Sequence, residues 1–328
     1  MERNADGLWV WYGQHRLEWP AWASESGEDQ HGLWAVFRVG DVEQRMRWIP
    51  PGRFLMGSPA SEQGRWDDEG PQHEVTLTQG YWMAETPCTQ ALWEEVMGDN
   101  PSRFPSPQRP VESVSWDDVQ GFLERLGVRV PGLEPSLPTE AQWEYACRAG
   151  TTTATYAGDL DIRGECDAPL LDDIAWYGGN SGVGYELEQG YDSSDWPNKQ
   201  YPHTRAGTRI VGQKRCNPWG LYDMLGNVLE WCADMHQPYT AAAVVDPLVS
   251  RGEGRVTRGG SWGTHARGVR AAFRDWREPG YRGDGLGFRL IRGQGLRQQE
   301  PASSSKQGRE ARARDEPGAR PASPRRRR

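Results

Sequence analysis

Apolar and polar residues alternate in several short stretches of the chain. Residues 8–12 (LWVWY) and 33–37 (LWAVF) are strand-like, and residues 74–83 (EVTLTQGYWM) alternate well enough to predict one half-buried strand. Between residues 150 and 258 there is little periodicity, and short strands are expected among Gly, Pro and Asp turns. The pattern therefore predicts an α+β fold that is irregular and rich in loops.

Three helices have readable ends. Residues 89–97 form a predicted helix that starts at Thr89, and residues 115–126 begin with a Ser-Trp-Asp-Asp sequence that resembles a capping box. Thr139 with Gln142 repeats the capping pattern before residues 143–148. Each helix is expected to stop before a glycine: Gly98, Gly127 and Gly150.

Residues 258–290 (RGGSWGTHARGVRAAFRDWREPGYRGDGLGFRL) fit neither a helical nor a strand period. Glycines, arginines and aromatic residues form a regular frame, in which Trp262, Arg274, Phe288 and Arg289 are expected to hold the backbone. The positions between them vary in character without any period. Such a stretch is typical of loops that carry a binding surface on a rigid scaffold.

The chain of 328 residues has a net charge of −8, but its two parts differ in sign. From residue 297 to the end there are ten Arg or Lys against four Asp or Glu, or +6, which leaves −14 for the rest. An acidic body argues against nucleic-acid binding by the folded part. No apolar run approaches a membrane span and no secretion signal is visible, so a cytoplasmic protein without membrane contact is expected.

Five cysteines, an odd number without any C-x-x-C pair, predict free thiols rather than a disulfide framework. The 17 Trp and 40 Gly predict an aromatic core among tight turns. Three parts are expected: a Trp-rich β extension at residues 1–45, a main domain at 46–292 and a disordered basic tail at 293–328.

Five blocks of the main domain resemble one known family. In order, they are "IPPGRFLMGSP", "RPVESVSWDDVQGFLERL", "LPTEAQWEYACRAGT", "WGLYDMLGNVLEW" and "RGGSW…LGFRL". The resemblance is to the sulfatase-modifying-factor domain, which includes the formylglycine-generating enzymes, and it spans roughly residues 45 to 292. It implies a variant of the C-type lectin fold.

Formylglycine-generating enzymes bind copper through two cysteines shortly after the Gly-Gly-Ser-aromatic motif. Those places hold Thr264 and Val269 here, and no cysteine follows Cys232. Thiolates select Cu(I), so no copper is expected. A second branch of the superfamily contains non-haem iron enzymes, but the six histidines show no H-x-H or H-x-[DE] spacing. An oxidoreductase of either kind stays the alternative function.

The resemblance also implies a structural calcium site. The matching ligands would be the side chains of Asp223 and Glu230 and the carbonyl groups of Gly226 and Val228. Carboxylate and carbonyl oxygens are the ligands that calcium prefers. The other interpretation is that Glu230 only accepts hydrogen bonds from turn amides.

Residues 258–290 also resemble the variable region of proteins diversified by retroelements, which share this lectin-type fold. That resemblance implies a ligand-binding surface, with a protein as the expected ligand. Trp276 and Glu278 do not arise by adenine changes in the usual asparagine codon of such templates, so an ordinary, non-diversified family member remains the alternative. The predicted ligand-binding residues are Thr264, His265, Phe273, Asp275, Trp276, Tyr281 and Asp284.

Overall fold

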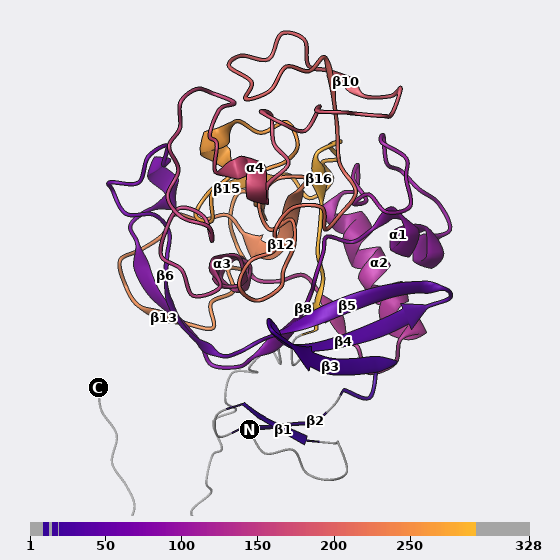
Figure 1. Cartoon of the computed structure of the whole chain (residues 1–328). Coiled ribbons are helices and arrows are strands. Elements are labelled where there is room, and N and C mark those ends of the chain that lie inside the picture. The colour runs from indigo at the N-terminus through magenta and orange to yellow at the C-terminus, as the bar shows by residue number, and fades with distance from the viewer. Residues whose placement is uncertain (1–8, 13–14, 19, 293–328) are drawn as a thin grey trace, which may run out of the picture. The chain divides into compact units, whose positions relative to one another are not determined.

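The computed structural model describes residues 9–12, 15–18 and 20–292, with side chains from residue 20 onward. The tail predicted to be disordered, 293–328, lies outside the described residues. The fold is α+β, as predicted, with short elements joined by long loops (Figure 1).

The largest sheet has six strands in the order β3-β4-β5-β8-β17-β9. Strands β3, β4 and β5 form an antiparallel meander, in which the strand-like residues 33–37 of the sequence lie in β4 and bury Leu33, Ala35 and Phe37. The boundary predicted after residue 45 falls inside β5, so the segment from β3 onward shares a sheet with the main domain. The strands are β3 (Glu25–Asp29), β4 (Gly32–Val39), β5 (Val42–Ile49), β8 (Tyr81–Ala84), β9 (Pro135–Ser136) and β17 (Ile291–Arg292).

A four-stranded sheet, in the order β15-β14-β12-β16, carries the frame of residues 258–290. Its strands are β12 (Leu229–Met235), β14 (Arg255–Arg258), β15 (Arg274–Arg277) and β16 (Leu286–Gly287). A three-stranded sheet contains β6 (Gly52–Met56), β7 (His73–Leu77) and β13 (Val244–Val245). Two further pairs are β1 (Trp9–Tyr12) with β2 (His15–Glu18), and β10 (Tyr191–Asp192) with β11 (Arg205–Ala206).

The three predicted helices are present, with the predicted N-terminal caps. Thr89 accepts the Leu92 amide, and Ser115 and Thr139 each form a capping box. The second helix continues three residues past its predicted end at Leu126, because the buried Leu126 and Val130 hold the last turn. The helices are α1 (Gln90–Met97), α2 (Trp116–Arg129), α3 (Glu140–Arg148) and α4 (Leu171–Ile174), with 3-10 turns η1 (Asp67–Glu69) and η2 (Ala266–Gly268).

The single strand predicted over residues 74–83 was wrong. The segment forms the end of β7 and most of β8, which belong to different sheets. The chain turns at Gly80, where a Cβ atom would lie 2.3 Å from the Trp48 ring and 2.8 Å from the Ile49 carbonyl oxygen. The alternation of apolar residues continues through this turn, so the period alone did not reveal it.

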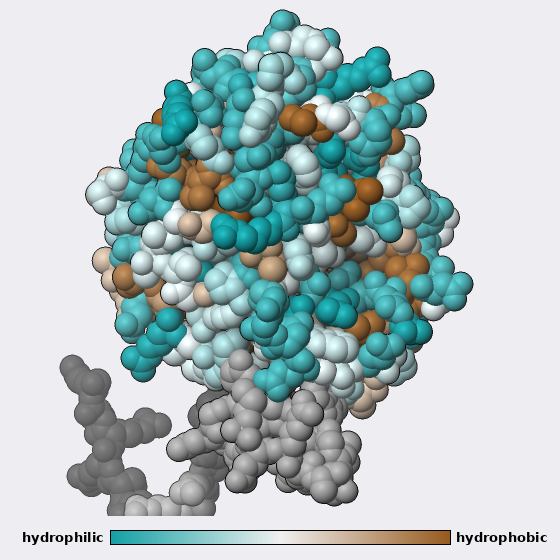
Figure 2. Space-filling model, in the orientation of Figure 1, coloured by the Kyte–Doolittle hydropathy of each residue, from teal (hydrophilic) through white to brown (hydrophobic). Residues whose placement is uncertain are grey.

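Helix α3 lies almost wholly in the interior, with eight of its nine residues buried. It therefore brings two acidic side chains, Glu140 and Glu144, into the core. Buried carboxylates need partners, and arginines from the four-stranded sheet supply them. The face of the molecule in Figure 2 is mostly hydrophilic, with hydrophobic residues in separate small groups rather than one broad patch.

Candidate ligand-binding site

The regular frame of residues 258–290 is a set of buried arginine–carboxylate pairs. Four guanidinium groups of this stretch are at most 3% exposed. A buried charge is tolerated when it is paired and hydrogen-bonded, and each arginine reaches a carboxylate on another segment. The pairs are Arg258 with Glu144, Arg270 with Glu69, Arg274 with Glu140, and Arg289 with Glu230.

These pairs set the charge state of the interior. Burial alone would raise the pKa of Glu140, but Arg274 and Arg258 hold that pKa below its usual range. Burial would likewise lower the pKa of Arg274, and Glu140 raises it instead. The Arg274–Glu140 pair is therefore ionised at neutral pH. The frame is fixed by directional contacts rather than by a hydrophobic period. This explains why neither a helical nor a strand template fits the stretch.

The aromatic frame residues, which were expected to hold the backbone, are buried. Trp262 is 4% exposed, and its ring nitrogen donates to the Asp284 carbonyl oxygen at 2.8 Å. Phe288 packs edge-on against Trp93 and Phe122. Two glycines before Trp262 turn the chain off the end of β14.

A pocket of about 480 Å³ opens beside this frame. Five of the seven predicted ligand-binding residues line it: Thr264, His265, Phe273, Asp275 and Asp284. The other lining residues are Tyr191, Trp196, Leu229, Ser261, Trp262, Gly263, Arg277 and Gly285.

One wall of the pocket is aromatic and comes from two distant segments. The Trp196 and Trp262 rings stack with centroids 5.7 Å apart, and Tyr191 lies 6.0 Å from Trp196 and 5.7 Å from Trp262. Tyr191 and Trp196 belong to the loop around β10, which runs above β15 and β16 in the view of Figure 1. The sequence prediction missed both. Large aromatics in a Gly- and Asp-rich loop without core periodicity were the available signal.

The polar side chains of the pocket form ion pairs within the protein. Asp275 contacts Arg277 at 2.6 Å, and Asp284 pairs with Arg103. The Arg103 guanidinium lies over the Tyr191 ring at 5.3 Å from its centroid. The carboxylates of Asp275 and Asp284 are both part-exposed. A ligand can therefore replace the arginine partner of either carboxylate without leaving a buried charge unpaired.

Two predicted residues lie outside this pocket. Trp276 stands between Asp275 and Arg277 on β15, so strand alternation turns it to the opposite face, where it stacks on His236 with ring centroids 6.1 Å apart. Tyr281 is 46% exposed and lies under the Arg277 guanidinium, 5.7 Å from its ring centroid.

The positions of the family's copper cysteines hold groups that do not suit Cu(I). Thr264 accepts the Ser261 amide through its hydroxyl at 2.8 Å, and Val269 is fully buried. Neither offers a soft donor. Within the described part of the chain, no three His, Cys, Asp or Glu side chains gather in a way that could hold a metal.

The predicted calcium ligands are only partly suited to hold a cation. Both carboxylate oxygens of Glu230 accept from Arg289, and one also accepts from the Trp143 ring nitrogen. Asp223 accepts the Gly212 amide through Oδ2, while its buried Oδ1 has no hydrogen-bond partner among the described residues. Burial raises the pKa of Asp223 to about 6. The unpaired oxygen fits a cation, whereas Glu230 has a sufficient role without one.

The short, loop-joined α+β elements and the pocket beside a twisted sheet define a C-type-lectin-like fold of the formylglycine-generating-enzyme type. Residues 38–294 match the model of the sulfatase-modifying factor enzyme 1-like domain, and the chain belongs to this family. The family resemblance predicted from the sequence is thus confirmed.

Three similar proteins differ in name and in coverage. The chaperone protein LppX of Paenibacillus barcinonensis is 28% identical over 253 residues, 66% of this chain and 81% of that protein. A formylglycine-generating enzyme of Thermomonospora curvata is 32% identical over 203 residues, 60% of this chain and 57% of that enzyme. Treponema denticola variable protein 1 is 28% identical, with a TM-score of 0.64 over 79% of this chain and 99% of that one.

No helix within the described residues is both long and apolar enough to cross a membrane.

Proposed function

We propose that this protein binds a protein ligand in the pocket between residues 258–290 and the loop of Tyr191 and Trp196. The observation that carries the proposal is the convergence of five predicted residues on one pocket, although they were chosen from the sequence alone. The pocket size lies within the range of small-ligand sites, about 300–1,000 Å³, which suits a few side chains of a partner.

The chemistry of the pocket supports a protein partner. Buried aromatic anchors within a charged, hydrated rim are typical of interface hot spots. Here Trp196 and Phe273 are part-exposed anchors, and the ion-paired Asp275 and Asp284 form the rim. One similar protein is named as a chaperone, and a chaperone acts by binding other proteins, which supports a binding role here.

We further propose that residues 258–290 are diversified. The buried arginine pairs tolerate change at the intervening pocket positions, because those positions hold few of the frame contacts. The check is genomic: a near-copy of codons 258–290 that differs mainly at adenines should lie beside a reverse-transcriptase gene. Finding neither would identify an ordinary, non-diversified family member.

The binding proposal is tested by selecting peptides from a displayed random library on the immobilised full chain. Affinities of the enriched peptides are then measured for variants. Trp196→Ala and Phe273→Ala should each weaken binding by at least about tenfold, the loss expected of an anchor of roughly 1.4 kcal/mol or more. Their unfolding transitions should stay cooperative.

Tyr281→Ala is the matched control. It removes an exposed aromatic of the same segment that does not line the pocket, so its affinity should equal that of the wild type. Equal losses of affinity in all three variants would instead mean that binding extends beyond the pocket. Peptide affinities that none of the variants changes would show that the pocket is not the binding site.

We also propose a calcium ion at Asp223, with Gly226, Val228 and Glu230 as the other ligands. The buried, unpaired Oδ1 of Asp223 supports it. If a cation pairs with this oxygen, a chelator lowers the melting temperature, and Asp223→Asn abolishes that sensitivity. A melting curve that is indifferent to calcium and chelator would leave Glu230 with its arginine partner alone.

A further inference from the structure

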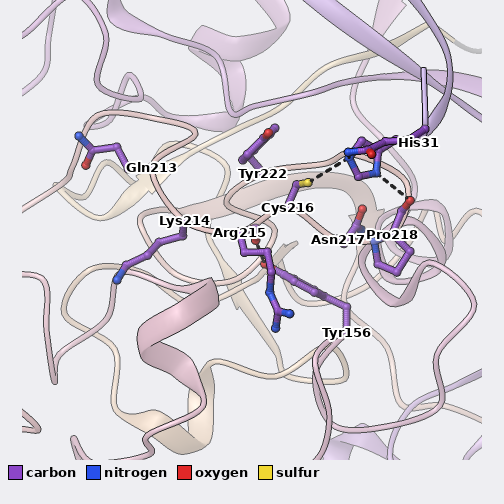
Figure 3. Close-up of a pocket in the computed structure, with 10 residues that line it drawn as sticks. His31, Tyr156, Gln213, Lys214, Arg215, Cys216, Asn217, Pro218 and Tyr222 are labelled. Carbon is purple, nitrogen blue, oxygen red and sulfur yellow. Dashed lines mark hydrogen bonds between the residues drawn. The ribbon is translucent and has the colours of Figure 1, made fainter. Parts of the chain in front are cut away.

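A second pocket, of about 630 Å³, shares no lining residue with the ligand pocket. The loop before β12 and the turn between β3 and β4 line it together with Tyr156, and Figure 3 shows these side chains. Its lining residues are Gln30, His31, Tyr156, Gln213, Lys214, Arg215, Cys216, Asn217, Pro218 and Tyr222.

The thiol in this pocket differs from every other thiol of the chain. All five cysteines are unpaired, as the sequence predicted, and four of them are buried. Burial raises the pKa of Cys166 to about 11 and that of Cys147 to about 12, and it also raises the pKa values of Cys88 and Cys232. Cys216 alone is part-exposed, so it is the thiol that a solute can reach.

An imidazole faces this thiol. The Cys216 sulfur points toward His31, with Sγ 3.7 Å from Nε2, as Figure 3 shows. The other ring nitrogen, Nδ1, lies 3.2 Å from the Pro218 carbonyl oxygen, which only accepts, so Nδ1 carries the proton. The Gln30 amide nitrogen lies 3.1 Å from Nε2 and donates to it. Nε2 is therefore the unprotonated ring nitrogen, and its one lone pair faces both the Gln30 amide and the Cys216 thiol. It can take the thiol proton in exchange for the hydrogen bond from the exposed Gln30 amide, which is the arrangement of an activated nucleophile.

The pair is held in place by rigid neighbours. Asn217 is buried and donates to the carbonyl oxygens of Ala146 and Cys147 at 2.7 and 3.3 Å. On the other side, a Cβ atom at Gly220 would lie 3.0 Å from the Cβ of His31, so the turn packs closely there. The sulfur and the imidazole thus meet through tertiary packing rather than by proximity in sequence.

The charged groups that line the pocket are basic. Asp29, which accepts the His31 amide, and Glu85 are both bound by Arg47, at 2.7 and 2.6 Å. Lys214 lies 3.3 Å from Asp172, whereas exposed Arg215 has no salt bridge within the described residues. The pocket therefore suits an anionic molecule.

From these contacts we infer that Cys216 forms a mixed disulfide with a small, carboxylate-bearing disulfide that binds in this pocket. His31 Nε2 takes the thiol proton, and the thiolate attacks one sulfur of the bound disulfide. A new S–S bond forms, the old one breaks, and its electron pair leaves on the second sulfur as a thiolate. The incoming disulfide is itself the oxidant, so no other reactant is needed.

The test uses the native full chain and two probes, the dianionic aryl disulfide dithiobis-nitrobenzoate and the dicationic disulfide cystamine. Each rate is divided by the rate of the uncharged thiol N-acetylcysteine amide with the same probe, which removes the difference in leaving groups without adding a charge preference of its own. The normalised rate should be at least about tenfold higher for the anionic probe, with one adduct per chain mapped to Cys216 by mass spectrometry. Cys216→Ser should abolish the adduct, and Cys166→Ser should keep it.

Two further variants separate the roles of the neighbours. His31→Gln should slow both probes by at least about tenfold, as expected when a general base is lost, while Arg215→Gln should lower the preference for the anionic probe. Equal normalised rates for the two probes, or an adduct on another cysteine, would overturn the inference. An unchanged reaction rate in His31→Gln would show that His31 does not act as the base.

Discussion

At the scale of single residues, neighbours in the sequence have opposite tasks. Arg274 is buried and pairs with Glu140, while Asp275, the next residue, lines the pocket. The frame therefore separates residues that fix the fold from residues that line the pocket, one position at a time.

Arg274→Met should lower the free energy of unfolding by about 3–5 kcal/mol, because it leaves the Glu140 carboxylate buried with fewer partners. Asp275→Asn should change it by less than about 0.5 kcal/mol, since an amide oxygen can still accept the Trp276 amide. Denaturant unfolding of both variants checks this. Similar losses in the two would mean that frame and pocket are not separate.

A second residue gives a pH dependence. Glu112 is fully buried, and burial, with Asp284 nearby, raises its pKa from 4.5 to about 7. Between these values the folded chain keeps a proton that the unfolded chain releases, so the free energy of unfolding falls as pH rises. In Glu112→Gln, the side-chain amide oxygen can still accept the hydrogen bond from the Phe104 amide. The substitution removes the proton release, so the free energy of unfolding no longer falls with pH through this residue. The variant should therefore gain up to about 3 kcal/mol over the wild type between pH 4.5 and 7.

Chemical denaturation at several pH values measures that difference. A gap between wild type and variant that stays constant across the window would contradict the raised pKa. Other titrating groups cancel, because both chains contain them.

At the scale of elements, the turn after β14 depends on a glycine. Gly260 has φ +74°, and a Cβ atom there would lie 2.6 Å from the Gly268 carbonyl oxygen. Gly260→Ala should cost about 1–3 kcal/mol through strained backbone and close contact. Gly280, with nothing within 4 Å of an added Cβ, is the control, and Gly280→Ala should be neutral by thermal unfolding. A neutral Gly260→Ala would show that the turn can relax.

Elements with local causes were the predictable ones. Thr89, Ser115 and Thr139 marked three helix starts because capping is decided within a few residues. The break at Gly80 was not predictable, since it results from contact with Trp48 on another strand. The site divides in the same way: the gaps of residues 258–290 were visible in the sequence, whereas Tyr191 and Trp196 arrive by tertiary folding.

At the scale of the whole molecule, β3 and β4 belong to the six-stranded sheet. Deleting residues 1–45 removes both strands and the buried Leu33, Ala35 and Phe37. We expect the chain without residues 1–45 to lose cooperative thermal unfolding. Deletion of residues 1–19 leaves the six-stranded sheet complete, so that variant should still unfold cooperatively. Circular dichroism distinguishes the two, and a sharp transition in the shorter chain would make the segment a separable extension.

The aromatic wall of the ligand pocket has a consequence for inheritance. Tyr191 and Trp196 are encoded 67 and 62 codons upstream of residue 258. If residues 258–290 are diversified as proposed, these two residues of the cavity wall stay unchanged. Every descendant would present a new set of polar contacts opposite the same two rings. The partners bound by such diversified proteins would share one flat, apolar feature and differ in the groups around it.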